Sequence, residues 1–181
     1  MLRSLCFIID VLVYEQNKKI NEHLINTLEH NDIRTNILFT SSIHENRDTF
    51  YGKSKLDSTS YFQDICNLWN KDFVKLIFPN IFGPFAKPNH TSVVATFCND
   101  VILNKKSIIN NVDLELIYVD QAINSILNFK EKKDFSKCRV NLLDLHKRIQ
   151  NLYEQYCQNE SIILKDTLDV QLFTTLKSHI I

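Results

Sequence analysis

The sequence predicts an α/β protein, in which a parallel sheet is flanked by helices and followed by further helices at the C-terminal end. Apolar runs of strand length alternate along the chain with longer segments whose apolar residues recur at helical spacing, an order typical of parallel sheets. The chain has 181 residues, of which 44% are hydrophobic and 23% are charged. These values are ordinary for a globular protein, and we expect one main domain with a tail.

The first predicted element is a buried strand, Leu5–Tyr14, because this run is rich in Ile, Val, Leu and Phe without helical periodicity. The alternative for this run is a helix that caps the sheet edge. An amphipathic helix is predicted over Lys19–His30, and a second short strand over Ile37–Thr40. The apolar stripe of the predicted helix consists of Ile20, Leu24, Ile25 and Leu28.

A long helix is predicted over Phe50–Asn70, followed by a third strand over Phe73–Phe78. Core-facing positions of this helix are expected at Leu56, Tyr61, Phe62, Ile65, Cys66 and Trp69. The segment Pro79–Pro88 holds all three prolines and one of the two glycines, so we interpret it as a loop leaving the carboxyl end of a strand. In open parallel sheets, ligands bind at that end.

The remainder of the chain is predicted to be mostly helical. Asp120 is expected to cap the helix that follows the last predicted strand. The predicted elements are a helix over Thr91–Asn104, a strand over Leu114–Val119, a helix over Gln121–Phe129, a charged linker over Lys130–Lys137, and helices over Leu142–Gln158 and Leu168–Ser178.

Composition excludes several classes of function. Lys plus Arg equals Asp plus Glu, so no overall basic field favours nucleic acid. The apolar N-terminal run is too short for a transmembrane helix and no cleavage site follows it, so we expect neither a membrane span nor a signal peptide. The five cysteines are odd in number and widely spaced, and the histidines have no partners at metal spacing. We therefore expect reduced thiols, no metal site and a cytoplasmic location.

The strongest candidate for chemistry is the pair Tyr51 and Lys55, in the run FTSSIHENRDTFYGKSK. Residues four apart stand on one face of a helix. An ammonium group one turn away favours the phenolate and lowers the pKa of a phenol, which suits acid–base catalysis. Ser41 and Ser42, at the end of the preceding strand, are placed to direct hydroxyl groups at the same reacting oxygen.

The same spacing occurs at Tyr14 and Lys18, but no serine-bearing strand precedes that pair, which makes it an internal control. The charged residues between the strand and Tyr51, namely Glu45, Arg47 and Asp48, are interpreted as ordinary loop charges.

Four motifs give the chain a family resemblance: SS-x and a short loop before YGKSK, then PNIFGP, KPNHTSVVATFC and LIYVD. Together they resemble the extended short-chain dehydrogenase/reductase superfamily. Within it, the short interval between the serines and Tyr51 and the KPN-x-x-SVVATFC segment resemble the UDP-2-acetamido-2,6-dideoxy-hexulose 4-reductases of capsule and O-antigen synthesis. The resemblance implies a partial Rossmann-like sheet that lacks the first nucleotide-binding strands, and it implies that the C-terminal cupin domain of that branch is absent.

The resemblance implies a role for each motif residue. Tyr51 would donate a proton to the substrate ketone, Lys55 would lower its pKa and hold the nicotinamide ribose, and Ser42, with Ser41 as the alternative, would hydrogen-bond the ketone oxygen. The cofactor, NADP or NAD, would contact these two catalytic residues and the backbone of Pro79, Asn80 and Ile81. A UDP-linked amino sugar would contact Ser41, Asn80, Lys87 and Asn89.

By this resemblance, residues 1–135 would form the C-terminal part of a reductase domain, and residues 136–181 a helical tail on the substrate side. The chain has only two glycines, which excludes a Gly-rich phosphate-binding turn, so weak cofactor binding is expected. A complementing N-terminal half or a homo-oligomer is therefore an expected partner. The alternatives to a reductase are a non-catalytic interaction module of the same family and a sugar-nucleotide 4-epimerase or dehydratase.

Overall fold

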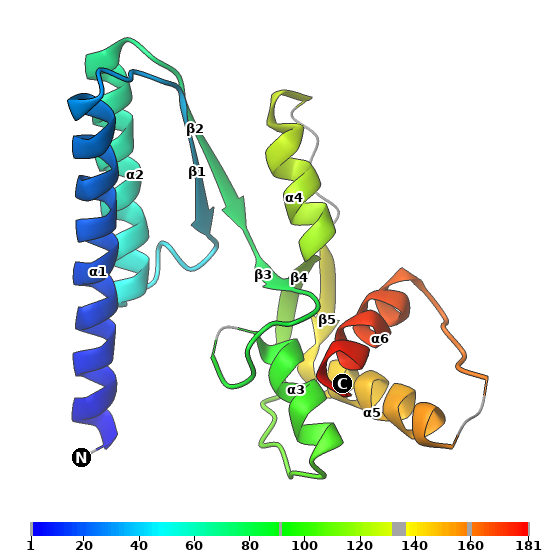
Figure 1. The fold of residues 1–181 in the computed structure, drawn as a ribbon. Coiled ribbons are helices and arrows are strands. Elements are labelled where there is room, and N and C mark those ends of the chain that lie inside the picture. Colours follow the sequence, from blue (N-terminus) through cyan, green and yellow to red (C-terminus); the bar gives the residue numbers. More distant parts are fainter. Residues whose placement is uncertain (1, 91, 132–136, 159–160, 181) are drawn as a thin grey trace. The chain divides into compact units, whose positions relative to one another are not determined.

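The computed structural model describes residues 2–90, 92–131, 137–158 and 161–180, and confirms the α/β class (Figure 1). The chain forms two compact units, Met1–Phe78 and Pro79–Ile181. Within the described ranges, no helix combines the length and the apolar character needed to cross a membrane.

The first unit begins with one long helix, α1 (Leu2–His30). The predicted strand Leu5–Tyr14 is therefore wrong. This run is helical, as in the alternative, and α1 packs against α2; that it caps a sheet edge remains a prediction. No glycine or proline precedes Gly52, so nothing in the sequence interrupts a helix that continues into Lys19–His30. Periodicity alone does not separate a continuous apolar run in a strand from one in a helix, which explains the error.

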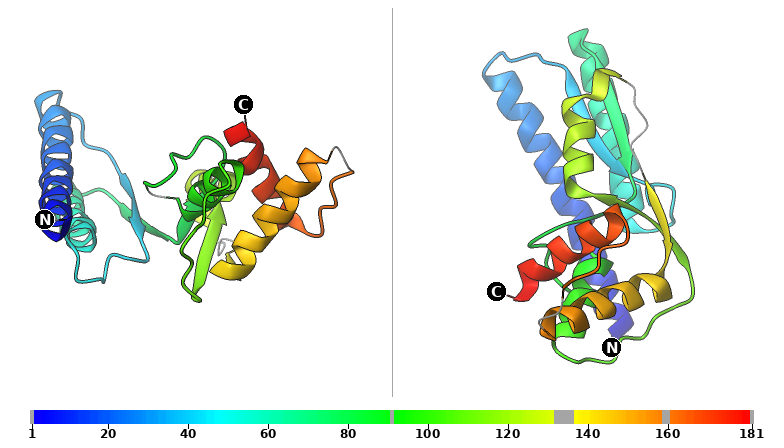
Figure 2. Two further views of the ribbon diagram at one scale, coloured as in Figure 1. Left: turned by 90° about the horizontal axis from the view of Figure 1, so that it is seen from below. Right: turned by 90° about the vertical axis from the view of Figure 1, so that its right-hand side faces the viewer.

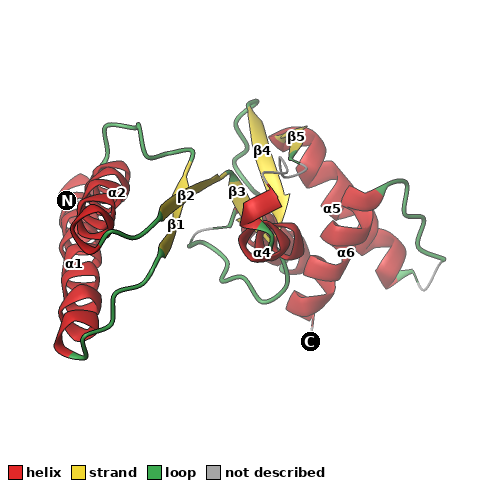
Figure 3. Ribbon diagram, turned by 90° about the horizontal axis from the view of Figure 1, so that it is seen from above, coloured by secondary structure: helices red, strands yellow, loops and turns green. Residues whose placement is uncertain are grey.

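Helix α2 (Phe50–Trp69) lies beside α1 (Figure 3) and runs in the same direction (Figure 1). Two amide-to-hydroxyl hydrogen bonds join the helices. Asn17 Nδ2 donates to Ser54 Oγ over 3.1 Å, and Asn21 Nδ2 donates to Ser58 Oγ over 2.7 Å. Each pair is separated by 37 positions, so the two bonds fix one register between the helices.

The apolar core of the first unit is small. It contains Ile25, Phe62 and Trp69, with partly buried apolar residues packed around them. Toward the start of α2, the buried positions that face α1 are serines, Ser54 and Ser58, and not apolar residues. Three residues that we expected to face the core are exposed: Ile20, Leu24 and Leu56.

Two parallel strands complete the first unit, β1 (Ile37–Ser42) and β2 (Phe73–Phe78), as predicted, with β1 two residues longer. Helix α2 is the crossover that parallel neighbours require. It begins where Thr49 Oγ1 accepts a hydrogen bond from Gly52 N and ends at Asn70, which has the left-handed backbone of a helix C-cap.

The second unit contains a three-stranded sheet in the order β3-β4-β5. Strand β3 (Asn80–Phe82) pairs in parallel with β4 (Asp113–Tyr118), and β5 (Cys138–Asn141) pairs with β4 in antiparallel orientation. The prediction of a loop over Pro79–Pro88 is therefore wrong for its first residues, which pair with β4. Strand β5 was not predicted, because its four residues carry too little apolar pattern to indicate a strand.

The predicted helices of the second unit are confirmed with small shifts of their ends. Asp120 lies inside the first turn of its helix and does not cap it, because Tyr118 is the N-cap residue and its N–H donates to Gln121 Oε1. Residues 132–136 of the predicted linker lie outside the described residues. The helical elements are α3 (Val93–Ile102), α4 (Val119–Leu127), a 3-10 turn (Phe129–Glu131), α5 (Leu142–Cys157) and α6 (Thr167–Ile180).

Helices α3, α5 and α6 pack against one another and against the three-stranded sheet (Figure 2). The core of this unit draws residues from both sides of position 135. Its buried members include Phe82, Val94, Phe97, Leu116, Leu145, Ile149, Leu172 and Leu176. The division of function between residues 1–135 and 136–181 remains a prediction.

Arg148 fastens α6 to α5. Its Nη1 lies 2.8 Å from Asp166 Oδ2 and 2.9 Å from Asp169 Oδ1. Asp166 caps α6, since its Oδ1 accepts a hydrogen bond from Asp169 N. The hydrogen bond from Arg148 lowers the pKa of Asp166, while the Asp169 side chain is 5% exposed and depends on Arg148 to balance its charge.

We expect Arg148→Met to destabilise the second unit by about 2 kcal/mol, because it leaves the buried Asp169 carboxylate without its cation. Urea denaturation followed by far-ultraviolet circular dichroism measures the change. The depressed pKa of Asp166 means that this difference is full near neutral pH and shrinks as the pH falls through the acid range.

Arg139→Met is the matched control, since Arg139 makes an ion pair with Asp113 in which the side chains are 75% and 45% exposed. Its expected effect is about 0.5 kcal/mol. Equal effects of the two substitutions would contradict the assigned role of Arg148.

Candidate active site

The predicted catalytic residues of the first unit gather where β1 ends and α2 begins. Ser41 and Ser42 are the last two residues of β1, Tyr51 is the second residue of α2, and Lys55 lies one turn further on. Lys55 Nζ is 5.8 Å from the centroid of the Tyr51 ring, as expected for two residues on one helix face.

Lys55 is the more buried member of this pair. Its Nζ donates a hydrogen bond to Thr40 O over 3.3 Å and lies 5.1 Å from the centroid of the Phe39 ring. Burial lowers the pKa of Lys55, whereas the Tyr51 side chain is 40% exposed. A partly desolvated ammonium group thus lies beside an accessible phenol.

The two serines differ in the use of their hydroxyl groups. Ser41 is buried, and its Oγ donates a very short hydrogen bond to Glu45 Oε2. Ser42 is half-buried, and its Oγ accepts a hydrogen bond from His44 N over 3.2 Å. That bond uses an oxygen lone pair and leaves the hydroxyl hydrogen of Ser42 for an acceptor, so the arrangement favours Ser42 over Ser41 as a hydrogen-bond donor.

Glu45 is a buried carboxylate, not the loop charge that we expected. It is 5% exposed, and its Oε1 lies 2.9 Å from Lys75 Nζ on β2. Burial by itself would raise the pKa of Glu45, but the hydrogen bonds from Ser41 and Lys75 outweigh it and lower the pKa. The sequence held no signal for this pair, whose partners are 30 positions apart.

Gly52 allows the loop before α2 to lie directly against the helix. A Cβ at this position would come within 2.5 Å of Arg47 O and 2.8 Å of His44 O. Any larger residue would push the loop away from the first turn of α2. Gly52 and Glu45 together therefore fix the position of Tyr51 relative to the end of β1.

Tyr14 and Lys18 lie in a different environment. They line a cavity of about 200 Å³ between α1 and α2, whose serines, Ser54 and Ser58, belong to a helix. Tyr14 donates a 2.6 Å hydrogen bond to Asp57 Oδ2, which raises the pKa of Tyr14. A raised pKa opposes the formation of phenolate, so this pair is poorly suited to acid–base chemistry.

The other predicted site residues belong to the second unit. Asn80 lies in β3 between Pro79 and Ile81, and its Nδ2 donates to Glu115 O over 3.0 Å, so one amide hydrogen serves the fold. The loop after β3 carries Lys87 and Asn89, both exposed. The contacts predicted for these residues with cofactor and sugar nucleotide remain predictions, as do the roles of Tyr51, Lys55 and Ser42. Among the described residues, no group of three His, Cys, Asp or Glu side chains could hold a metal ion.

We expect Glu45→Gln to destabilise the first unit by about 2 kcal/mol, because it leaves the Lys75 ammonium without a counter-charge in a mostly buried position. Trp69 is the single tryptophan and is buried in this unit, so its fluorescence during urea denaturation reports the change. The lowered pKa of Glu45 implies that the difference persists at neutral pH and disappears as the pH falls through the acid range.

The double variant Glu45→Gln, Lys75→Met should recover part of the loss, since it removes both charges. Glu22→Gln is the exposed control, because Glu22 pairs with Lys18 over 4.0 Å at the surface, and we expect a change below about 0.5 kcal/mol. A double variant less stable than Glu45→Gln would refute the charge argument.

A search of protein-family models finds no match to this chain. A curated relative is the UDP-2-acetamido-2,6-beta-L-arabino-hexul-4-ose reductase of Pseudomonas aeruginosa, which is 29% identical over 119 residues. The match covers 65% of this chain and 32% of the relative. This chain therefore aligns with about a third of the reductase.

Solved structures agree with this relationship. The capsular polysaccharide assembling protein CapF of Staphylococcus aureus is 26% identical, with a TM-score of 0.76 over 88% of this chain and 46% of CapF. A UDP-N-acetylglucosamine 4-epimerase of Methanobrevibacter ruminantium, solved with UDP-N-acetylmuramic acid, shares the fold at 18% identity, with a TM-score of 0.74 over 94% of this chain and 71% of the epimerase.

WbmF of Bordetella bronchiseptica, solved with NADH, also shares the fold at 14% identity, with a TM-score of 0.61 over 79% of this chain and 58% of WbmF. The resemblance predicted from the motifs is thus confirmed: the chain is similar in sequence to a UDP-sugar hexulose reductase and in fold to CapF, to a UDP-sugar 4-epimerase and to WbmF.

Proposed function

We propose that this chain carries the catalytic and substrate-binding part of an NAD(P)H-dependent reductase, which reduces the C4 ketone of a UDP-linked N-acetylated 6-deoxy-hexulose. The observation that supports this most is the half-buried ammonium of Lys55, 5.8 Å from the accessible Tyr51 ring at the carboxyl end of β1. The similarity to the Pseudomonas reductase supports the substrate class.

In this mechanism Tyr51 donates its phenolic proton to the ketone oxygen, and the ketone becomes an alcohol. Bound NAD(P)H supplies the hydride that C4 receives. Lys55 stabilises the phenolate left on Tyr51 and would hold the ribose hydroxyls of the cofactor. Ser42 donates its hydroxyl hydrogen to the ketone oxygen, which aligns that oxygen with Tyr51 and stabilises the negative charge that develops on it.

The hydrogen bond between Ser41 and Glu45 helps to hold Ser42 and Tyr51 in these positions. Because Glu45 accepts the Ser41 hydrogen, the Ser41 hydroxyl is directed into the protein and not toward a ketone. The end of β1 is thereby held in one conformation. We propose that this leaves Ser42 as the serine that contacts the substrate.

The residues of this chain fit the nicotinamide end of the cofactor better than its pyrophosphate end. Tyr51 and Lys55 supply the groups that a ribose would contact. A pyrophosphate is normally held by backbone N–H groups of a glycine-rich turn, but Gly52 packs against carbonyl oxygens and Gly83 against the Val119 side chain. Neither glycine leaves an open cradle of N–H groups for phosphate.

The missing cradle is the observation that favours the second candidate, a non-catalytic interaction module of the same family. The third, a sugar-nucleotide 4-epimerase or dehydratase, would use the same Tyr51 and Lys55 chemistry. The two enzymes require proton transfer at Tyr51, and the non-catalytic module does not. The reductase and the epimerase differ in the product that they form.

We expect the 181-residue chain to bind NADPH only weakly, with a dissociation constant above about 100 μM, because the pyrophosphate has no backbone cradle. Isothermal titration calorimetry with NADPH measures it. Micromolar affinity would contradict the prediction and require a second mode of phosphate binding.

We expect reductase activity when the glycine-rich nucleotide-binding half of a related reductase is fused to the N-terminus of this chain. In the fusion, Tyr51→Phe should lower kcat/KM by about 10²- to 10⁴-fold, because it removes the proton donor and little else. The assay follows NADPH oxidation with a UDP-linked 4-keto sugar. Mass spectrometry of the product then distinguishes reduction from epimerisation.

Tyr14→Phe is the matched control, since it removes the same hydroxyl from the second Tyr-x-x-x-Lys pair and should leave kcat/KM within about twofold of the parent. A folded fusion that binds NADPH but has no activity would support the non-catalytic module. Equal losses from Tyr14→Phe and Tyr51→Phe would refute the assignment of Tyr51.

A further inference from the structure

The loop that joins β3 to α3 is held at two points by hydrogen bonds to helices. Phe85 N donates to Ser178 Oγ on α6 over 3.0 Å, and Asn89 N donates to Thr96 Oγ1 on α3 over 3.0 Å. These bonds hold the backbone, while the side chains of Phe85, Lys87 and Asn89 are exposed. The segment between them is therefore fixed in position while it presents these side chains to solvent.

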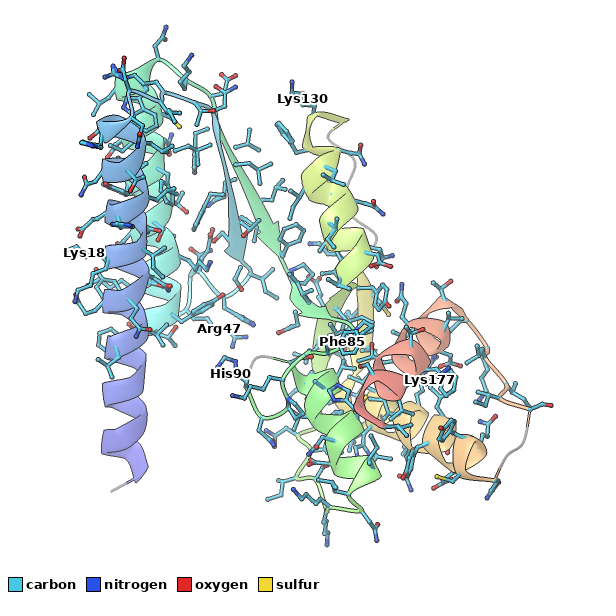
Figure 4. All side chains as sticks on the ribbon, viewed as in Figure 1. Lys18, Arg47, Phe85, His90, Lys130 and Lys177 are labelled. Carbon is cyan, nitrogen blue, oxygen red and sulfur yellow. The ribbon has the colours of Figure 1, made fainter. Side chains whose placement is uncertain are left out.

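Phe85 adopts a backbone conformation that is unfavourable for its side chain. Its φ is 63°, in the left-handed region where a bulky L-residue is a genuine outlier and where glycine or asparagine is preferred. Phe85, which is labelled in Figure 4, is nevertheless 84% exposed. Core packing does not explain the ring, since almost all of it faces solvent.

A strained backbone at a residue whose side chain does not pack in the core indicates a functional constraint. The hydrogen bond to Ser178 explains the backbone conformation of the loop, but it would form equally well with glycine at this position. What phenylalanine adds is a flat aromatic face, displayed at a fixed point. Such a face stacks on nucleobases and on the C–H faces of sugar rings.

The neighbours of Phe85 in the loop carry complementary chemistry. Lys87, two residues further on, is exposed and offers a point charge for phosphate, and Asn89, also exposed, offers an amide. Asn89 has a φ of 55° and is the second left-handed residue of the loop. An aromatic face, a cation and an amide on one fixed loop match the ring, diphosphate and hydroxyl groups of a sugar nucleotide.

We propose that Phe85 is a stacking platform for a ring of the sugar nucleotide, and thus a determinant of substrate binding beyond Lys87 and Asn89. This inference rests on the proposed function, because it takes the sugar nucleotide as the ligand. A single exposed ring is too small an apolar area for a protein interface, which favours the small-molecule ligand.

The experiment uses the full chain and measures stability and binding together. Phe85→Gly and Phe85→Asn remove the ring and relieve the backbone, so both should raise the midpoint of urea denaturation. Both should also raise the dissociation constant for UDP-N-acetylglucosamine by about fivefold or more, the loss typical of one stacking contact. Phe85→Trp keeps an aromatic face and should retain the affinity. Titration calorimetry measures each constant.

Asn104→Gly is the matched control. Asn104 follows α3, has a φ of 50° and lies outside the loop. The substitution therefore places glycine at another left-handed position and should leave the dissociation constant unchanged. UDP serves as a second probe. An equal loss of affinity for UDP assigns the stacked ring to uracil, whereas a loss confined to UDP-N-acetylglucosamine assigns it to the sugar.

The outcomes separate this inference from the proposed function. If the unaltered chain binds UDP-N-acetylglucosamine and the glycine and asparagine variants bind it equally well, the stacking role of Phe85 is wrong and the proposed function stands. If the unaltered chain does not bind the probe, the stacking role of Phe85 is wrong, whereas the proposed function is decided by the activity of the fusion with the nucleotide-binding half. If Phe85→Gly lowers stability and affinity in parallel, the ring is structural and the stacking role is again wrong.

Discussion

The buried carboxylate of Glu45 ties together three pieces of backbone that come from different parts of the sequence. It accepts the hydroxyl of Ser41 on β1 and pairs with Lys75 on β2, while its own loop lies against Gly52 at the start of α2. A buried charge is tolerated only when its partners are held in place, so the carboxylate and its surroundings stabilise one arrangement of the loop. The position of Tyr51 follows from that arrangement.

The two Tyr-x-x-x-Lys pairs of this chain show that equal spacing does not give equal surroundings. Lys55 is half-buried, and its Nζ lies 5.8 Å from the centroid of the Tyr51 ring. Tyr14 instead donates to Asp57, and this hydrogen bond raises its pKa. The same four-residue interval thus occurs in two different environments, because a strand end adjoins one pair and a second helix adjoins the other.

Local pattern predicted much of the fold, and non-local contacts account for what it missed. β2 and α2 followed from apolar spacing and from flanking polar residues, whereas Leu5–Tyr14 was assigned to a strand because an apolar run fits either element. Of the candidate site, the placement of Tyr51 and Lys55 on one helix face could be predicted. The Glu45–Lys75 pair could not, since only the pairing of β1 with β2 brings the two residues together.

The hydrogen-bonded contact between α1 and α2 has a thermodynamic consequence. Two asparagines and two serines remove little apolar surface from water, so this part of the contact adds little to the heat capacity of unfolding. Its strength changes little with temperature, whereas the apolar cluster around Ile25 weakens on cooling. A slip of one helical turn would also leave amide and hydroxyl groups unpaired. The polar contact therefore specifies where α1 lies along α2, and the burial of apolar residues around Ile25 stabilises the packing of the two helices.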